Sequence, residues 1–232
     1  MTKFIAIVSG KGGVGKTTTA INLGNALSNM GKETLVLDGN LTTPNIGVYL
    51  GFANPPASVH SVMEGTHTIR DATYVHASGT KFMPGSININ ALQKIDLNKV
   101  KNLHKKLKGC FESVLIDTGS GITPETLTLM NIADEILVVT NPELAAVTDA
   151  LRTIKKAEQQ GKTILGVVLN KISEESEMSI ENVESVLGVP IIAAIPESIE
   201  VRQSRTMKHP VVYLNPASDV AAEFNKLAEK LK

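Results

Sequence analysis

Short apolar runs alternate with amphipathic stretches along most of the 232-residue chain. The runs are nearly continuous in valine, isoleucine and leucine, which is typical of strands covered on both faces of a sheet. The strands predicted from these runs are residues 4–8, 34–37, 113–116, 136–140, 164–169 and 190–194. Apolar residues at helical spacing predict helices near 17–30, 97–108, 123–131, 144–160, 179–187 and 218–231. The alternation predicts an α/β fold with a doubly wound, mostly parallel sheet and helices on both faces, in a single domain over residues 1–232.

The pattern is weaker between residues 52 and 95, where prolines and glycines interrupt the apolar positions. We expect a strand that runs into a loop over residues 80–85. His60, His67 and His76 fall in this region without metal-ligand spacing, and we expect all three at the surface.

A glycine-rich turn follows the first predicted strand and precedes a helix. Residues 9–18 read SGKGGVGKTT, which fits the phosphate-loop spacing G-x-x-x-x-G-K-[ST]. Glycines let the backbone N–H groups of such a turn point at an anion, and the helix adds its positive end. We expect Lys16 to reach the β- and γ-phosphates of a nucleotide and the Thr17 hydroxyl to bind Mg²⁺. The candidate nucleotide-binding residues of this loop are Gly10, Lys11, Gly12, Gly13, Val14, Gly15, Lys16, Thr17 and Thr18.

A second lysine, Lys11, begins the loop, so that it reads KGGVGKTT. With this signature the chain from Lys3 onward resembles the MinD/ParA family of deviant-Walker-A ATPases, above all its archaeal MinD-like branch. The resemblance implies the P-loop NTPase fold, with ATP and Mg²⁺ as cofactors. It also implies that Lys11 crosses a dimer interface to the partner's nucleotide, in an ATP-dependent homodimer that encloses ATP. A protein partner that regulates or recruits the dimer is implied as well.

Two aspartates each end a predicted strand. Asp38 follows residues 34–37 and Asp117 follows residues 113–116. After a buried strand opposite the phosphate loop, Asp117 should hold Mg²⁺ through Thr17 or water. The resemblance adds Asp38, whose counterpart in the family orders the water shell of Mg²⁺, so the predicted Mg²⁺ site consists of Thr17, Asp38 and Asp117. The resemblance places Asp38 first in switch I and Asp117 at the Walker B position. It makes Gly121 the switch II glycine, whose N–H senses the γ-phosphate. The family usually has proline where this chain has Gly119, which should make switch II more flexible.

The family's second switch I aspartate, which helps to position the attacking water, is replaced here by Asn40. An amide can hold a water by hydrogen bonding, but it carries no charge and cannot accept a proton. We therefore predict slow hydrolysis and a long-lived ATP dimer, with Lys11, Lys16 and Asn40 as the candidate catalytic residues. The alternative is that another group orients the water. The sequence does not separate a natural asparagine from an engineered Asp→Asn replacement.

Two further strand ends carry candidate residues. Asn170 offers the donor and acceptor that an adenine edge requires, and the resemblance places it on adenine together with Pro196 and Glu197. After residues 136–140, the segment T-N-P-E makes Glu143 a candidate dimer-interface residue by resemblance. The same segment also fits a helix start with Asn141 as N-cap.

Composition narrows the function classes. The 23 basic and 23 acidic residues cancel and aromatic residues are scarce, so the chain has no strong nucleic-acid signal. A single cysteine, Cys110, suggests a reducing compartment, and no signal peptide or transmembrane run is visible. We expect a cytoplasmic protein whose last helix packs on its body and is no membrane-targeting tail. Recruitment to a membrane would need a partner.

The resemblance implies a switch that positions a cellular structure, such as a division site. Two alternatives remain. Asn40 is compatible with a catalytically silent ATP-binding scaffold. A metallocluster carrier or maturation ATPase shares the fold, but it needs two suitable cysteines per subunit where this chain has Cys110 alone. A DNA-binding protein of plasmid partition is disfavoured by the neutral net charge of the chain.

Overall fold

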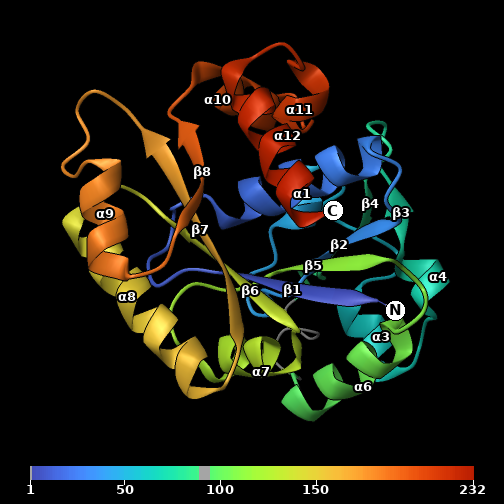
Figure 1. The fold of residues 1–232 in the computed structure, drawn as a ribbon. Coiled ribbons are helices and arrows are strands. Elements are labelled where there is room, and N and C mark those ends of the chain that lie inside the picture. The colour runs from blue at the N-terminus through green and yellow to red at the C-terminus, as the bar shows by residue number, and fades with distance from the viewer. Residues whose placement is uncertain (1, 89–94) are drawn as a thin grey trace.

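The computed structural model describes residues 2–88 and 95–232, and its centre is one twisted sheet (Figure 1). The strands of the sheet are β1 (Lys3–Val8), β2 (Thr34–Asp38), β3 (Tyr74–Val75), β4 (Lys81–Met83), β5 (Ser113–Asp117), β6 (Glu135–Thr140), β7 (Thr163–Ile172) and β8 (Ile191–Pro196). Their order is β3-β4-β2-β5-β1-β6-β7-β8, and all neighbours are parallel except β3 and β4. This confirms the predicted doubly wound, mostly parallel sheet.

Helices cover both faces of the sheet (Figure 1). They are α1 (Lys16–Asn29), α2 (Ile46–Tyr49), α3 (Val59–Glu64), α4 (Ile69–Ala72), α6 (Leu97–Leu107), α7 (Pro124–Ile132), α8 (Leu144–Gln159), α9 (Ile180–Leu187), α10 (Ile199–Thr206), α11 (Val211–Leu214) and α12 (Asp219–Leu231). In Figure 1, α1 and α12 lie together on one face, and α6 to α9 lie on the other. No helix within the described residues is long and apolar enough to span a bilayer.

The central strands are buried on both faces, as their unbroken apolar runs predict. In β1, Ile5 and Ile7 join a core cluster with α1 and α12, whereas Phe4, Ala6 and Val8 point to the opposite face. Every strand next to β1 is parallel to it, so their carboxyl ends meet at one edge. All the predicted site residues belong to that edge or to the segments that follow it.

The six predicted strands and six predicted helices are confirmed within a few residues, and β4 confirms the strand predicted at 80–85. The short helices α2, α3, α4, α10 and α11 were not predicted. The prediction that His60 is exposed is wrong, because its side chain hydrogen-bonds inside the protein and it is 4% exposed. His67 is exposed and His76 is half-buried.

Candidate functional site

The glycine-rich loop joins the end of β1 to the start of α1, as its sequence predicts. Gly13 and Gly15 have φ angles of 79° and 106°, which L side chains rarely adopt. Space is short as well, because a Cβ atom on Gly15 would lie 2.0 Å from the Asn170 amide nitrogen. That amide donates a hydrogen bond of 2.7 Å to the Val14 carbonyl, so β7 holds the loop from below.

Lys16 is the first residue of α1 and is 8% exposed. Its ammonium group donates to the Ser9 hydroxyl at 2.6 Å. Burial lowers the pKa of Lys16, while the nearby Asp117 opposes the shift. A buried cation with no ion pair of its own in the described structure is suited to meet an anionic ligand.

Asp38 and Asp117 end β2 and β5 side by side, because the strand register pairs them directly. One Asp117 oxygen accepts from the Thr17 hydroxyl at 2.6 Å. One Asp38 oxygen accepts backbone N–H groups of the segments after β2 and β4. The Oδ1 atoms of both aspartates are buried without a hydrogen-bond partner. Two unpartnered carboxylate oxygens beside a hydroxyl are the oxygen ligands that Mg²⁺ prefers, so the residues fit the predicted metal.

The pKa values of Asp38 and Asp117 predict how Mg²⁺ binding depends on pH. Burial and the neighbouring Asp117 raise the pKa of Asp38 to about 8, and burial raises that of Asp117 to about 6. Between about pH 4 and pH 8 the folded protein thus holds more protons than the unfolded chain, so these groups lower its stability as pH rises. Because Mg²⁺ binds the ionised form, its affinity should rise up to about tenfold per pH unit between about pH 6 and pH 8.

Calorimetric titration of Mg²⁺ into the protein with ADP, from pH 6 to 9, would measure this rise. The Asp38→Asn variant should flatten the upper part of the curve, because it removes the group that titrates there. An affinity that does not change with pH in the unaltered protein would contradict the prediction.

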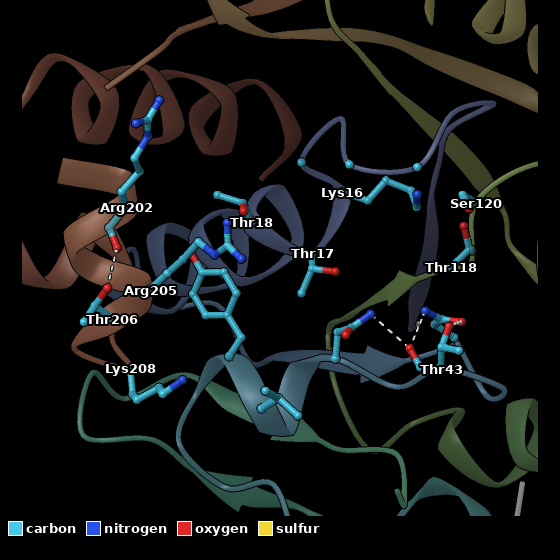
Figure 2. Close-up of a pocket in the computed structure, with 17 residues that line it drawn as sticks. Lys16, Thr17, Thr18, Thr43, Thr118, Ser120, Arg202, Arg205, Thr206 and Lys208 are labelled. Carbon is cyan, nitrogen blue, oxygen red and sulfur yellow. Dashed lines mark hydrogen bonds between the residues drawn. The ribbon is translucent and has the colours of Figure 1, made fainter. Parts of the chain in front are cut away.

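A cavity of about 880 Å³ opens over the phosphate loop (Figure 2). Lys16, Thr17 and Thr18 line it on one side, and α10 with the turn after it lines it on the other. Four cationic side chains reach it, and none of the described residues that line it is acidic. The cations are Lys16, Arg202, Arg205 and Lys208. A large cavity with this charge is suited to a polyphosphate ligand.

Sequence reasoning missed the side of the cavity formed by α10. Arg202 pairs with Glu197 at 2.8 Å, whereas Arg205 and Lys208 form no ion pair within the described part of the chain. Lys208 has a φ of 62° and packs its stem beside Gly51. The sequence did contain a signal for this side, since Arg202, Arg205 and Lys208 recur every three residues after the last strand. It was missed because no stripe of apolar residues predicted the helix that carries the arginines.

Asn40 lines the cavity, but both ends of its amide are already bonded. Its nitrogen donates to the Thr43 carbonyl at 2.5 Å, and its oxygen accepts from the Thr43 hydroxyl at 3.0 Å. The amide therefore folds back on its own loop. A carboxylate at this position could not donate to the Thr43 carbonyl, which would keep the hydrogen bond from the Asn45 amide at 2.9 Å.

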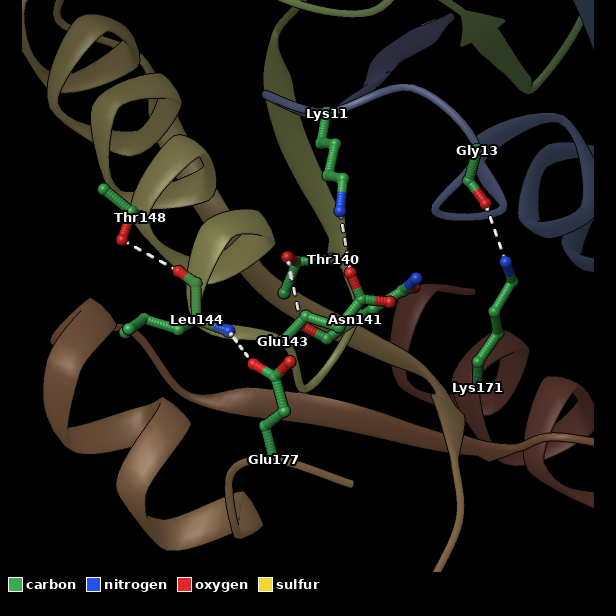
Figure 3. A network of polar contacts seen from close by, with 9 residues as sticks. All are labelled: Lys11, Gly13, Thr140, Asn141, Glu143, Leu144, Thr148, Lys171 and Glu177. Carbon is green, nitrogen blue, oxygen red and sulfur yellow. Dashed lines mark hydrogen bonds and ion pairs between the residues drawn. The ribbon is translucent and has the colours of Figure 1, made fainter. Parts of the chain in front are cut away.

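Lys11 is not among the residues that line the cavity. Its side chain points from the loop toward Glu143 at the start of α8 (Figure 3). Its ammonium group pairs with Glu143 at 2.7 Å, and both side chains are more than two-fifths exposed. The N-cap prediction for Asn141 is wrong, because α8 begins after Glu143. The Leu144 N–H donates instead to the Glu177 carboxylate at 2.8 Å. This carboxylate takes the place of a capping side chain from the helix start itself.

The residues predicted to bind adenine lie beside the cavity and do not line it. Asn170 is 7% exposed beneath Val14. Pro196 ends β8 and pairs in register with the end of β7, and the Glu197 N–H donates to the Ile172 carbonyl at 2.8 Å. The three residues are thus gathered at one strand edge, and their contact with adenine stays a prediction.

Gly121 also lies at the expected place, after β5 and close to the phosphate loop. Its φ is 78° and its N–H donates to the Ser9 carbonyl at 2.9 Å. To contact a γ-phosphate, this N–H would have to leave Ser9. Its sensing role stays a prediction.

Comparison with known proteins places these features in a family. The ParA family model, described as an NUBPL iron-transfer P-loop NTPase, matches residues 1–232. An uncharacterized ATP-binding protein of Methanocaldococcus jannaschii is 34% identical over 228 residues, which cover 98% of this chain and 86% of that protein.

Solved structures agree with this assignment. The septum site-determining protein MinD of Pyrococcus horikoshii, complexed with Mg-ADP, superposes with a TM-score of 0.94 at 35% identity, over 100% of this chain and 96% of that one. MinD in the MinC:MinD cell division complex of Aquifex aeolicus matches with a TM-score of 0.88 at 28% identity, over 99% and 95% of the two chains. The predicted fold is confirmed.

Proposed function

Because the chain belongs to the ParA family of P-loop NTPases, we propose that it is a MinD-like ATPase whose dimerisation is controlled by Mg-ATP. ATPases of this family use ATP and Mg²⁺, as the sequence predicted. The carrying observation is the buried Thr17–Asp117–Asp38 set, of which Thr17 lines the cationic cavity. Mg²⁺ held by these three residues would neutralise charge on the bound phosphates.

The loop residues have separate tasks in this proposal. The loop N–H groups and Lys16 bind the phosphates in the cavity that the loop lines. Asn170, with the Pro196–Glu197 segment, reads the base from the neighbouring strand ends. Asn40 lines the cavity, but its amide is engaged by Thr43 and cannot accept a proton, so it holds the attacking water weakly and turnover is slow.

Lys11 carries the dimerisation step of the proposal. Within one chain Lys11 pairs with Glu143 and does not line the cavity. Its ammonium group can therefore bind the nucleotide of a second subunit. Water screens this exposed pair, so Lys11 can leave Glu143 at little cost. The TNPE segment would then lie at the interface.

Removal of Lys11 separates dimerisation from nucleotide binding. With Mg-ATP we expect the unaltered protein to have the molar mass of a dimer by light scattering and Lys11→Ala to stay monomeric. ATP affinity of the variant should change by less than about twofold, because Lys11 does not line its own cavity. Lys155→Ala is the matched control, since it removes another exposed pair, with Glu158 at 2.9 Å. A dimeric Lys11→Ala protein would refute this role.

The biological setting follows from the relatives. MinD of Aquifex aeolicus forms a complex with MinC, and we propose that this chain likewise serves spatial positioning with a protein partner. It would act in the cytoplasm and reach a membrane through that partner. A metallocluster carrier is disfavoured, since the chain contains Cys110 alone and that thiol is exposed on the protein surface.

A further inference from the structure

Two side chains from distant helices hold the backbone of Leu41, the residue after Asn40. We call residues 39–45 the switch I loop. The Leu41 N–H donates to one carboxylate oxygen of Glu125, in the first turn of α7. The other oxygen of Glu125 accepts from the Thr42 hydroxyl at 2.9 Å. The Leu41 carbonyl is bonded to His60 Nε2, in α3, at 2.9 Å.

The bonds of His60 define its protonation. The Ser86 N–H donates to His60 Nδ1 at 3.0 Å, and a backbone N–H can only donate. Nδ1 therefore has a lone pair, and the neutral ring carries its proton on Nε2, where it donates to Leu41. Burial lowers the pKa of His60, against weaker opposing effects of the Leu41 bond, Glu64 and Glu125, so the neutral ring is favoured. His60 thus links the switch I loop to the loop after β4.

Glu125 links the same loop to the segment after β5. Asn40 and Ser120 line the nucleotide cavity, and both also line a neighbouring cavity of about 580 Å³ that Glu125 borders. Leu41 itself is 1% exposed, so its side chain anchors this point of the loop in the core. The loops after β2 and β5 are thereby joined through one residue whose side chain, N–H and carbonyl are all fixed.

We propose that Glu125 and His60 are positioning residues that clamp Leu41 and so set where Asn40 lies over the phosphate loop. The inference rests on the proposed ATPase function and adds to it a cause for the order of the switch I loop. Neither residue has to touch the nucleotide. Each acts through the backbone of Leu41, which is next to Asn40 in the chain, and Asn40 lines the nucleotide cavity.

The test uses Glu125→Ala and Glu125→Gln in the Asn40→Asp background, where turnover is expected to be measurable. Glutamine keeps an acceptor for the Leu41 N–H and can donate to the Thr42 hydroxyl, so it should rescue. Glu112→Ala is the matched control, because that exposed carboxylate also accepts a backbone N–H from a distant segment, Glu33, at 3.1 Å. Thr42→Val removes one clamp bond from an exposed residue and serves if Glu125→Ala does not fold.

Two readouts are taken. Without nucleotide, hydrogen exchange of the Leu41 amide should speed up about tenfold in Glu125→Ala. With ATP, kcat should fall about tenfold while KM changes less than about twofold, because the phosphate loop is untouched. Glu125→Gln and Glu112→Ala should resemble the background protein in both readouts, and His60→Ala should resemble Glu125→Ala.

Unchanged exchange or unchanged kcat in Glu125→Ala would overturn the proposal. Failure of the proposed function is visible separately, because the Asn40→Asp background itself would then not turn over ATP. In that case no variant can change turnover, and the proposed positioning role is refuted as well. Hydrogen exchange of the Leu41 amide would still show whether Glu125 and His60 hold this residue.

Discussion

Asn40→Asp should raise ATP turnover about a hundredfold, which is within the usual contribution of a general base. Two effects act together. A carboxylate can accept a proton from water, and it cannot donate to the Thr43 carbonyl that now holds the amide at 2.5 Å. The side chain should therefore turn away from Thr43 and toward the cavity that it lines.

Asn45→Asp is a matched control for this change. Asn45 lies in the same loop, lines the same cavity and also donates to the Thr43 carbonyl, at 2.9 Å. Asn45→Asp therefore adds the same charge to the loop and removes a hydrogen bond to the same carbonyl, but from a different side chain. Phosphate release measured with saturating Mg-ATP should increase in Asn40→Asp and stay low in Asn45→Asp. Equal turnover in Asn40→Asp and the unaltered chain would show that another group orients the water.

Lys16→Ala should weaken ATP binding roughly 10- to 100-fold, the usual effect of losing a hydrogen bond to a charged group. Lys16 is 8% exposed, so water cannot replace the lost ammonium group at little cost. Calorimetric titration with a non-hydrolysable ATP analogue measures the loss. Lys155→Ala, which removes an exposed lysine paired with Glu158, should leave the affinity unchanged. An affinity of Lys16→Ala within twofold of the unaltered protein, on the order of experimental error, would contradict the account.

The sequence predicted where most residues of the candidate phosphate and metal site lie, because each element there is local. The phosphate-loop spacing is contained in ten residues, and the side-by-side placement of Asp38 and Asp117 follows from two parallel strands that end together. Lys16 and Thr17 then follow from the helix start. In these cases chain order and spacing determine the geometry.

The rest depended on contacts between distant segments. His60 is buried because Leu41 and Ser86, 19 and 26 residues away, satisfy both ring nitrogens, and no local pattern signals that. Glu125 is an acidic residue in a first helical turn, where the dipole alone explains it. Arg205 and Lys208 were missed because α10 is short and lacks a buried stripe, with Ser204 its buried residue.

The lifetime of the proposed ATP dimer tests the central claim most directly. Cys110 is the single cysteine and is exposed, so separate batches can carry donor and acceptor dyes there. Mixing the batches with Mg-ATP and then chasing with unlabelled protein measures subunit exchange by energy transfer. The account predicts energy transfer that needs ATP and Lys11, with slow exchange in this chain and faster exchange in Asn40→Asp. Absence of ATP-dependent energy transfer, or equal exchange rates in the two proteins, would contradict it.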